Sequence, residues 1–210
     1  MLFAAVSFCL LTVNAQNEKF VKAMEPKVAA VDTTRSISGL TELANSFERI
    51  ANAEKNQWLP FYYAALCHVN IGYTNAQTGN VSNIDELADK AGGLLKTAET
   101  LTADNSEIHC LKKMLITLRV LVDPQHRYTD LAKAAEELVL ARKLNPENPR
   151  VYLLDGQDKF FSPEEFGGSK TEAKKLFEEA LKKYETFKPA SSIDPTWGVA
   201  QTKYFLSQAQ

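Results

Sequence analysis

The sequence has few of the residues that build disulfide frameworks, metal sites or nucleic-acid-binding surfaces. Its 210 residues include three Cys and three His. So few cysteines exclude a disulfide scaffold, and a chain of this length can bury a core without one. Lys and Arg number 24 against 26 Asp and Glu, which gives a formal net charge of −2. The sequence therefore lacks the basic excess typical of nucleic-acid-binding domains.

Recognisable catalytic and metal-binding motifs are also absent. The sequence contains no G-x-S-x-G, no H-E-x-x-H and no glycine-rich dinucleotide-binding turn. Cys67-His68 and His109-Cys110 suggest a zinc site with two cysteine and two histidine ligands. Adjacent residues on a helix point about 100° apart, however, so both members of a pair can rarely reach one ion. We therefore expect no enzyme activity, no cofactor and no metal.

The first 15 residues are typical of an export signal. They read MLFAAVSFCLLTVNA, without a charged side chain, and the apolar stretch 2–13 is too short to span a bilayer. Val13 and Ala15 provide small residues at positions −3 and −1 of a cleavage site. We predict a signal peptide over 1–15 that is cleaved after Ala15, and one domain over 16–210. The alternative is a buried N-terminal helix, and the lack of a basic n-region leaves open whether Met1 is the true start.

Export would place the mature chain in the periplasm or outside the cell. We expect no transmembrane segment in the mature chain, because no later apolar run is long enough to span a bilayer.

Apolar residues recur every three or four positions along the rest of the chain, a period that predicts helices almost end to end. No run of alternating apolar and polar residues indicates a strand, and most Gly and Pro fall between the periodic segments. Pro26 should kink or split the first helix. The expected helices are 18–31, 39–54, 58–73, 83–100, 105–122, 128–144, 149–160, 169–186 and 195–208.

Local start signals support several of these helices. Two pairs offer an N-cap residue followed by proline at the first helical position, and two others fit the capping-box pattern. The first two are Asn148-Pro149 and Asp194-Pro195, and the other two are Ser169-x-x-Glu172 and Asp104-x-x-Glu107.

One pair of expected helices has the spacing of a known repeat. Tyr152 and Gly156 follow the segment 145–149, and Ala173, Phe177 and Ala180 follow after a loop. This spacing resembles the tetratricopeptide repeat (TPR), in which small residues let two antiparallel helices approach and large residues fill the space between pairs. Further matches are Ala134, Leu138, Ala141 and Pro146, then Ala91, Leu95 and Ala98, then Phe61, Ala64 and Ala65, and finally Trp197, Ala200 and Tyr204.

The resemblance covers roughly residues 38 to 208. It implies an all-α fold, a right-handed α-solenoid of antiparallel helical hairpins with about three to four TPR-like units and a C-terminal capping helix. Two departures mark the array as divergent. Corresponding aromatic or His positions lie 48, 43 and 45 residues apart instead of 34, and Lys112 and Lys113 stand where small or apolar residues are expected. The alternative is a plain helical bundle.

The resemblance also implies a concave groove formed by the first helix of each pair, which suits a peptide or a partner helix. The groove positions are more apolar than a solvated surface, so either a partner covers them or the N-terminal helices fold over them. The candidate groove residues are Leu59, Tyr62, Leu66, Asn70, Met114, Arg150, Leu153, Gln157, Phe160 and Phe161.

The segment 160–170 places three Phe in seven residues beside two glycines. One interpretation is a partner-binding loop with aromatic anchors, and the other is a hairpin insertion whose Phe side chains enter the core.

The resemblance places Cys67 and Cys110 on neighbouring first helices, where they form either a disulfide or two buried free thiols. Their positions are offset by about 7 Å along the helix axis, which favours free thiols.

Together these observations predict an exported TPR-like scaffold or adaptor. It would bind a protein or peptide of the cell envelope through its concave face, without catalysis and without nucleic acid. The alternatives are a structural accessory subunit of an envelope complex and an enzyme with an unrecognised site.

Overall fold

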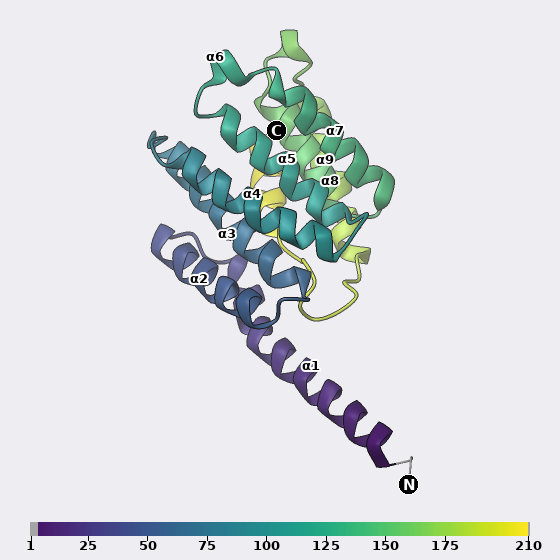
Figure 1. Ribbon diagram of the computed structural model, residues 1–210. Helices are drawn as coiled ribbons and strands as arrows, with labels where there is room; N and C mark the ends of the chain where they lie inside the picture. The colour runs from purple at the N-terminus through teal and green to yellow at the C-terminus, as the bar shows by residue number, and fades with distance from the viewer. Residues whose placement is uncertain (1–3, 210) are drawn as a thin grey trace.

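The computed structural model describes residues 4–209, with side chains from residue 18 onward, and this part of the chain is all-α (Figure 1). It contains no strand within those residues. The elements are α1 (Ala4–Val31), α2 (Ile37–Ala53), α3 (Trp58–Gln77), α4 (Ile84–Leu101), α5 (Ser106–Val120), α6 (Pro124–Arg127), α7 (Asp130–Leu144), α8 (Pro149–Phe161), the short 3-10 helix η1 (Glu164–Phe166), α9 (Lys170–Thr186) and α10 (Val199–Gln208).

The helices expected between residues 39 and 186 are confirmed to within a few residues, with a short separate helix, α6, before α7. Two of the expected N-caps form as predicted. The Asn148 side chain accepts from the Arg150 amide at 3.0 Å, and the Ser169 hydroxyl accepts from the Glu172 amide at 3.2 Å. These contacts satisfy amides that have no partner inside the helix.

Two local predictions are wrong, and a third is wrong in part. Pro26 does not split the first helix, because α1 continues through it, and a kink at this residue stays a prediction. The cap of α5 is Asn105, whose side chain accepts from the Glu107 amide at 2.9 Å, and Asp104 instead has a φ of 52°. The segment around Pro195 is not helical, and α10 begins only after Gly198, which has a φ of 108°.

Helices that lie close in the sequence pack together. α2 packs on α3, α3 on α4, α5 on α7 and α8 on α9, while α5 also touches α3, α4 and α8, and α10 packs on α9. Small residues permit the close approaches, as the sequence spacing predicts. A Cβ on Gly156 would lie 2.5 Å from the Phe177 ring, and one on Gly72 would lie 2.5 Å from the Leu118 side chain.

The C-terminal part of α1 belongs to the packed body of the protein. Phe20, Met24, Val28 and Val31 are all buried in the core, whereas Figure 1 shows the N-terminal part of α1 extending away from the other helices. The expected signal peptide over 1–15 lies outside the residues with described side chains, and its cleavage stays a prediction. Among the described helices, none combines the length and apolar character needed to cross a bilayer.

Candidate functional site

Most of the candidate groove residues lie on the faces of α3, α5 and α8 that point into the protein. We call this surface the inner face, and other parts of the same chain cover it. Six of them are buried: Leu59, Tyr62, Leu66, Met114, Arg150 and Leu153. Asn70, Gln157 and Phe160 are half-buried, and only Phe161 is exposed. The structure therefore leaves most of the predicted groove residues inaccessible to a partner.

The inner face is covered by the segment 187–198, which joins α9 to α10. The Trp197 indole donates to the Tyr62 hydroxyl at 2.8 Å, and the Tyr63 hydroxyl donates to the Ile193 carbonyl at 2.9 Å. The ring of Phe187 lies 4.8 Å from the centre of the Arg150 guanidinium. The covering segment thus comes from the C-terminal region, which neither alternative in the sequence analysis anticipated.

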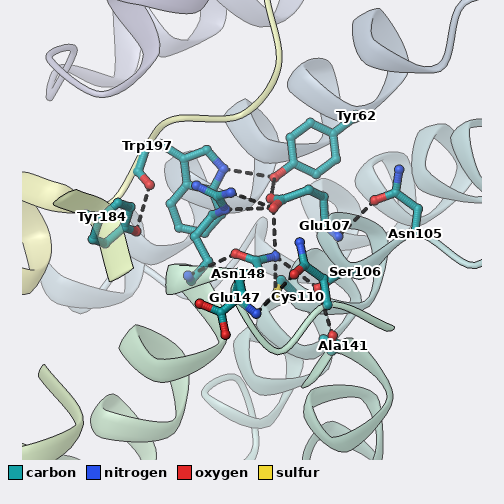
Figure 2. A network of polar contacts seen from close by, with 12 residues as sticks. Tyr62, Asn105, Ser106, Glu107, Cys110, Ala141, Glu147, Asn148, Tyr184 and Trp197 are labelled. Carbon is teal, nitrogen blue, oxygen red and sulfur yellow. Dashed lines mark hydrogen bonds and ion pairs between the residues drawn. The ribbon is translucent and has the colours of Figure 1, made fainter. Parts of the chain in front are cut away.

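A buried polar network lies beneath that segment, centred on Glu107 (Figure 2). One carboxylate oxygen of Glu107 accepts from Arg150 Nε at 2.8 Å and from Asn148 Nδ2 at 2.7 Å. The other accepts from the Tyr62 hydroxyl at 3.1 Å. The network joins three helices, since these residues come from α3, α5 and the start of α8.

The electrostatics of this network are those of a structural ion pair. Burial by itself would lower the pKa of the Arg150 guanidinium, but the charge of Glu107 raises it above its ordinary value. Arg150 has no exposed surface, and its guanidinium lies over the rings of Phe187 and Trp197. Nη2 lies 2.7 Å from the Glu107 carboxylate without a well-aligned hydrogen bond, and Nη1 has no hydrogen-bond partner among the described residues. The two aromatic rings contact the guanidinium as well, so the network has a structural role.

An aromatic cluster lies at the surface where α8, α9 and α10 meet. We use this name for Phe160, Phe161, Phe177, Tyr204 and Phe205. The ring of Phe205 lies 5.7 Å from Phe160, 5.5 Å from Phe161, 5.7 Å from Phe177 and 5.3 Å from Tyr204. Phe177 is fully buried, whereas Phe161 is 66% exposed and Tyr204 is 60% exposed. The cluster therefore has a packed base and an open aromatic surface.

The loop between α8 and α9 continues this surface. Phe166 in η1 is 78% exposed, so neither it nor Phe161 enters the core as the hairpin-insertion interpretation expected. The Lys170 ammonium lies 5.9 Å from the centre of the Phe160 ring. Lys170 forms no salt bridge with any residue that the structure describes. A free cation thus borders an exposed aromatic surface.

A surface opening of about 360 Å³ adjoins the cluster. We call it the α10 opening, because Gln201 and Tyr204 of α10 line it. Most of the rest of its lining comes from α3, from Met114 of α5 and from the region 31–40 at the end of α1 and the start of α2. Two groove candidates, Asn70 and Met114, line it together with Tyr73 and Trp197. Tyr204 belongs both to the opening and to the aromatic cluster, so the two adjoin at this residue.

The histidines and cysteines do not gather at this surface. Each His contacts a different carboxylate: His68 contacts Glu48 at 2.8 Å, His109 contacts Glu137 at 2.5 Å, and His126 contacts Asp123 at 2.8 Å. Within the described residues, no three His, Cys, Asp or Glu lie close enough to hold a metal ion. Cys67 and Cys110 are buried free thiols. Burial raises the pKa of Cys67 to about 12 and raises that of Cys110 as well.

Sequence reasoning found Phe160 and Phe161 through their local density but missed Tyr204 and Phe205. The aromatic and apolar residues of α10 fitted the pattern of a capping helix, and nothing local indicated that their rings meet those of α8.

Comparison with known proteins adds one finding. No protein-family model and no curated protein sequence matches the chain. Among solved structures, the HusA haemophore from Porphyromonas gingivalis is similar, with 34% sequence identity and a TM-score of 0.80. The match covers 91% of this chain and 92% of that one.

Proposed function

We propose that this chain, which belongs to the family of the HusA haemophore from Porphyromonas gingivalis, is itself a haem-binding carrier protein. The observation that carries the proposal is the extent of the similarity, 34% identity over 91% of this chain and 92% of the other. A likeness of fold alone would not indicate a ligand. A match that covers nearly the whole of both chains, at 34% identity, gives a firmer basis than a shared fold, because the matched region includes the surface as well as the core.

The exposed aromatic surface supports this proposal. Haem is a flat aromatic macrocycle with carboxylate groups at its edge, and aromatic side chains offer it large apolar contacts. The α10 opening and the aromatic cluster provide such contacts in Tyr204 and Phe161, with Lys170 nearby. Of the residues that line the opening, Met114 and the tyrosines are of types that ligate haem iron in other proteins.

The direct test is a titration of residues 16–210 with haemin, followed by the absorption spectrum of the haem. We expect a saturable change in the haem band, and the change should be lost when the chain is unfolded in guanidinium chloride. Spectra that equal the sum of free haemin and free protein at every concentration would contradict the proposal.

We further infer the finer architecture that the sequence suggests. The pairs α3/α4, α5/α7 and α8/α9 are divergent TPR-like units of a right-handed solenoid capped by α10. The close approach of Phe177 to Gly156 supports this inference, because both occupy positions that the repeat would assign to them. A crystal structure of the chain would test it, since successive pairs of a solenoid are related by a constant right-handed rotation.

We also propose that the protein is exported after cleavage at Ala15 and acts by binding, without catalysis. The uncharged segment 1–15 supports export. Mass spectrometry of the protein recovered from envelope and medium fractions would test the cleavage site. An N-terminus at Gln16 is the expected result, and an intact segment 1–15 in the exported protein would contradict the cleavage.

The second candidate function is a scaffold for a protein or peptide of the cell envelope. The polar part of the α10 opening favours it, because the side chains of Asn70, Gln77 and Gln201 line the opening beside Arg35. Amide and guanidinium groups suit the backbone and carboxylate of an extended peptide. Under this hypothesis, Asn70→Ala should weaken capture of an envelope peptide more than it weakens haemin binding, and an equal loss of both would contradict a peptide site distinct from the haem site.

A further inference from the structure

We propose that the aromatic cluster is the surface on which the haem macrocycle lies, with Phe161 and Tyr204 against the ring and Lys170 beside a carboxylate of the ligand. The inference rests on the proposed function and assigns the residues that would carry it. It concerns one ligand class, a flat aromatic ring with acidic groups at its edge.

The exposure of the cluster is the first argument. Soluble proteins rarely expose large contiguous apolar patches unless a ligand or partner covers them. Phe161 is 66% exposed and Tyr204 is 60% exposed, and the ring of Phe205 lies within 5.5 Å of both. These rings therefore form one patch drawn from two helices, α8 and α10, and not isolated surface aromatics.

The rigid base of the cluster is the second argument. Phe177 is fully buried and stacks on Phe205 at an interplanar angle of 19°. Gly156 leaves the space that the Phe177 ring occupies, because a Cβ there would lie 2.5 Å from it. The base thus fixes Phe205 before a ligand arrives, which reduces the entropy lost on binding.

The charge beside the cluster is the third argument. The Lys170 ammonium lies over the edge of the patch, 5.9 Å from the Phe160 ring centre, and has no salt-bridge partner among residues 18–209. The neighbouring Lys159 ammonium donates to the Gly167 carbonyl at 3.0 Å. A ligand carboxylate could therefore form an ion pair with the Lys170 ammonium without displacing a carboxylate of the protein.

The experiment compares haemin dissociation constants for Tyr204→Ala and Phe161→Ala with that of the wild-type chain. Covering the exposed part of either ring is worth on the order of tenfold in the dissociation constant, so each variant should bind about tenfold more weakly. The matched control is Tyr128→Ala, because Tyr128 is 64% exposed, like Tyr204, and lies outside the cluster. Far-UV circular dichroism confirms that each variant is folded.

Two further variants separate the ring from its hydroxyl and test the charge. Tyr204→Phe keeps the ring and should bind within about twofold of the wild type if the contact is made by the aromatic face. A loss as large as that of Tyr204→Ala would assign the contact to the phenolic oxygen and would overturn the stacking role. Lys170→Met should weaken binding by about threefold to tenfold at low salt, and less as salt is raised.

The outcomes distinguish this inference from the proposed function. If the wild type binds haemin and the Tyr204→Ala and Phe161→Ala variants bind as tightly as Tyr128→Ala, the haem lies elsewhere and only the inference is overturned. If the wild type does not bind haemin, the proposed function fails and the inference fails with it. Selective loss in the two cluster variants is the expected result.

Discussion

Replacing Glu107 by Gln should destabilise the protein by about 3–5 kcal/mol. The carboxylate of Glu107 is the only acidic group that the structure places in contact with the buried guanidinium of Arg150, with Nε at 2.8 Å and Nη2 at 2.7 Å. A glutamine would keep the shape of the side chain but leave the Arg150 charge buried and uncompensated. Breaking a buried pair in this way typically costs about 3–5 kcal/mol.

This loss is large compared with the total stability of a domain, which is typically about 5–15 kcal/mol. Urea unfolding followed by far-UV circular dichroism would measure it. With a slope of about 2 kcal/mol per M urea, the unfolding midpoint should fall by roughly 1.5–2.5 M while the slope stays unchanged.

A matched control makes the same substitution in a more accessible pair. Glu172 accepts from Lys175 at 2.8 Å, and both side chains are exposed, so Glu172→Gln should change the stability far less than Glu107→Gln does. The double variant Glu107→Gln/Arg150→Met should regain much of the lost stability, because no buried charge remains. A loss below about 1 kcal/mol in Glu107→Gln alone would refute the view that the network is desolvated.

Three further predictions concern residues in the interior of the protein. Gly156→Ala should destabilise the protein, because overpacking against Phe177 costs about 1–3 kcal/mol and outweighs a gain of about 1 kcal/mol in helix propensity. An unchanged or raised melting temperature would contradict this prediction. Cys67 and Cys110, buried and with raised pKa values, should react with a thiol reagent only after denaturation. Burial lowers the pKa of His68 below its unfolded value of about 6.5. As the pH falls, the unfolded chain therefore binds the proton before the folded chain does. The free energy of unfolding should decrease as the pH drops from about 6.5 toward the pKa of His68 in the folded state. Urea midpoints at pH 7.5 and 5.5 would measure this fall, which should be smaller in His68→Asn.

Local features of the sequence were enough to predict most of the helices. The period of the apolar residues and the caps at Asn148 and Ser169 are short-range signals, and short-range interactions decide where these helices begin. The spacing of Gly156 and Phe177 predicted a close contact between two helices, which the structure confirms.

The segment 187–198 was not predictable in the same way. Asp194-Pro195 has the pattern of a helix start, yet the conformation is set by distant partners. Trp197 donates to Tyr62, which is 135 residues away in the sequence, and Gly198 donates its amide to Asp32 at 3.1 Å. Tertiary contacts of this kind override local preference, and a single sequence contains no signal for them.

Only part of the aromatic cluster could be predicted from the sequence, because the rest depends on tertiary contacts. Phe160 and Phe161 stand out as neighbours in the sequence, but Phe205 joins them only because α10 folds back onto α9. Nothing in the sequence indicated the haem that we propose as the ligand, because the sequence contains no haem-attachment motif. The expectation of a protein or peptide partner came from the repeat resemblance and not from a binding site.

The most direct test of haem binding at the aromatic cluster is a crystal structure of residues 16–210 grown with haemin. We expect haem density against Phe161, Tyr204 and Phe205, with an acidic group of the ligand near Lys170. Two results would contradict haem binding at the aromatic cluster. One is haem bound only at a surface remote from α10, and the other is crystals of the folded protein that contain no haem despite saturating haemin.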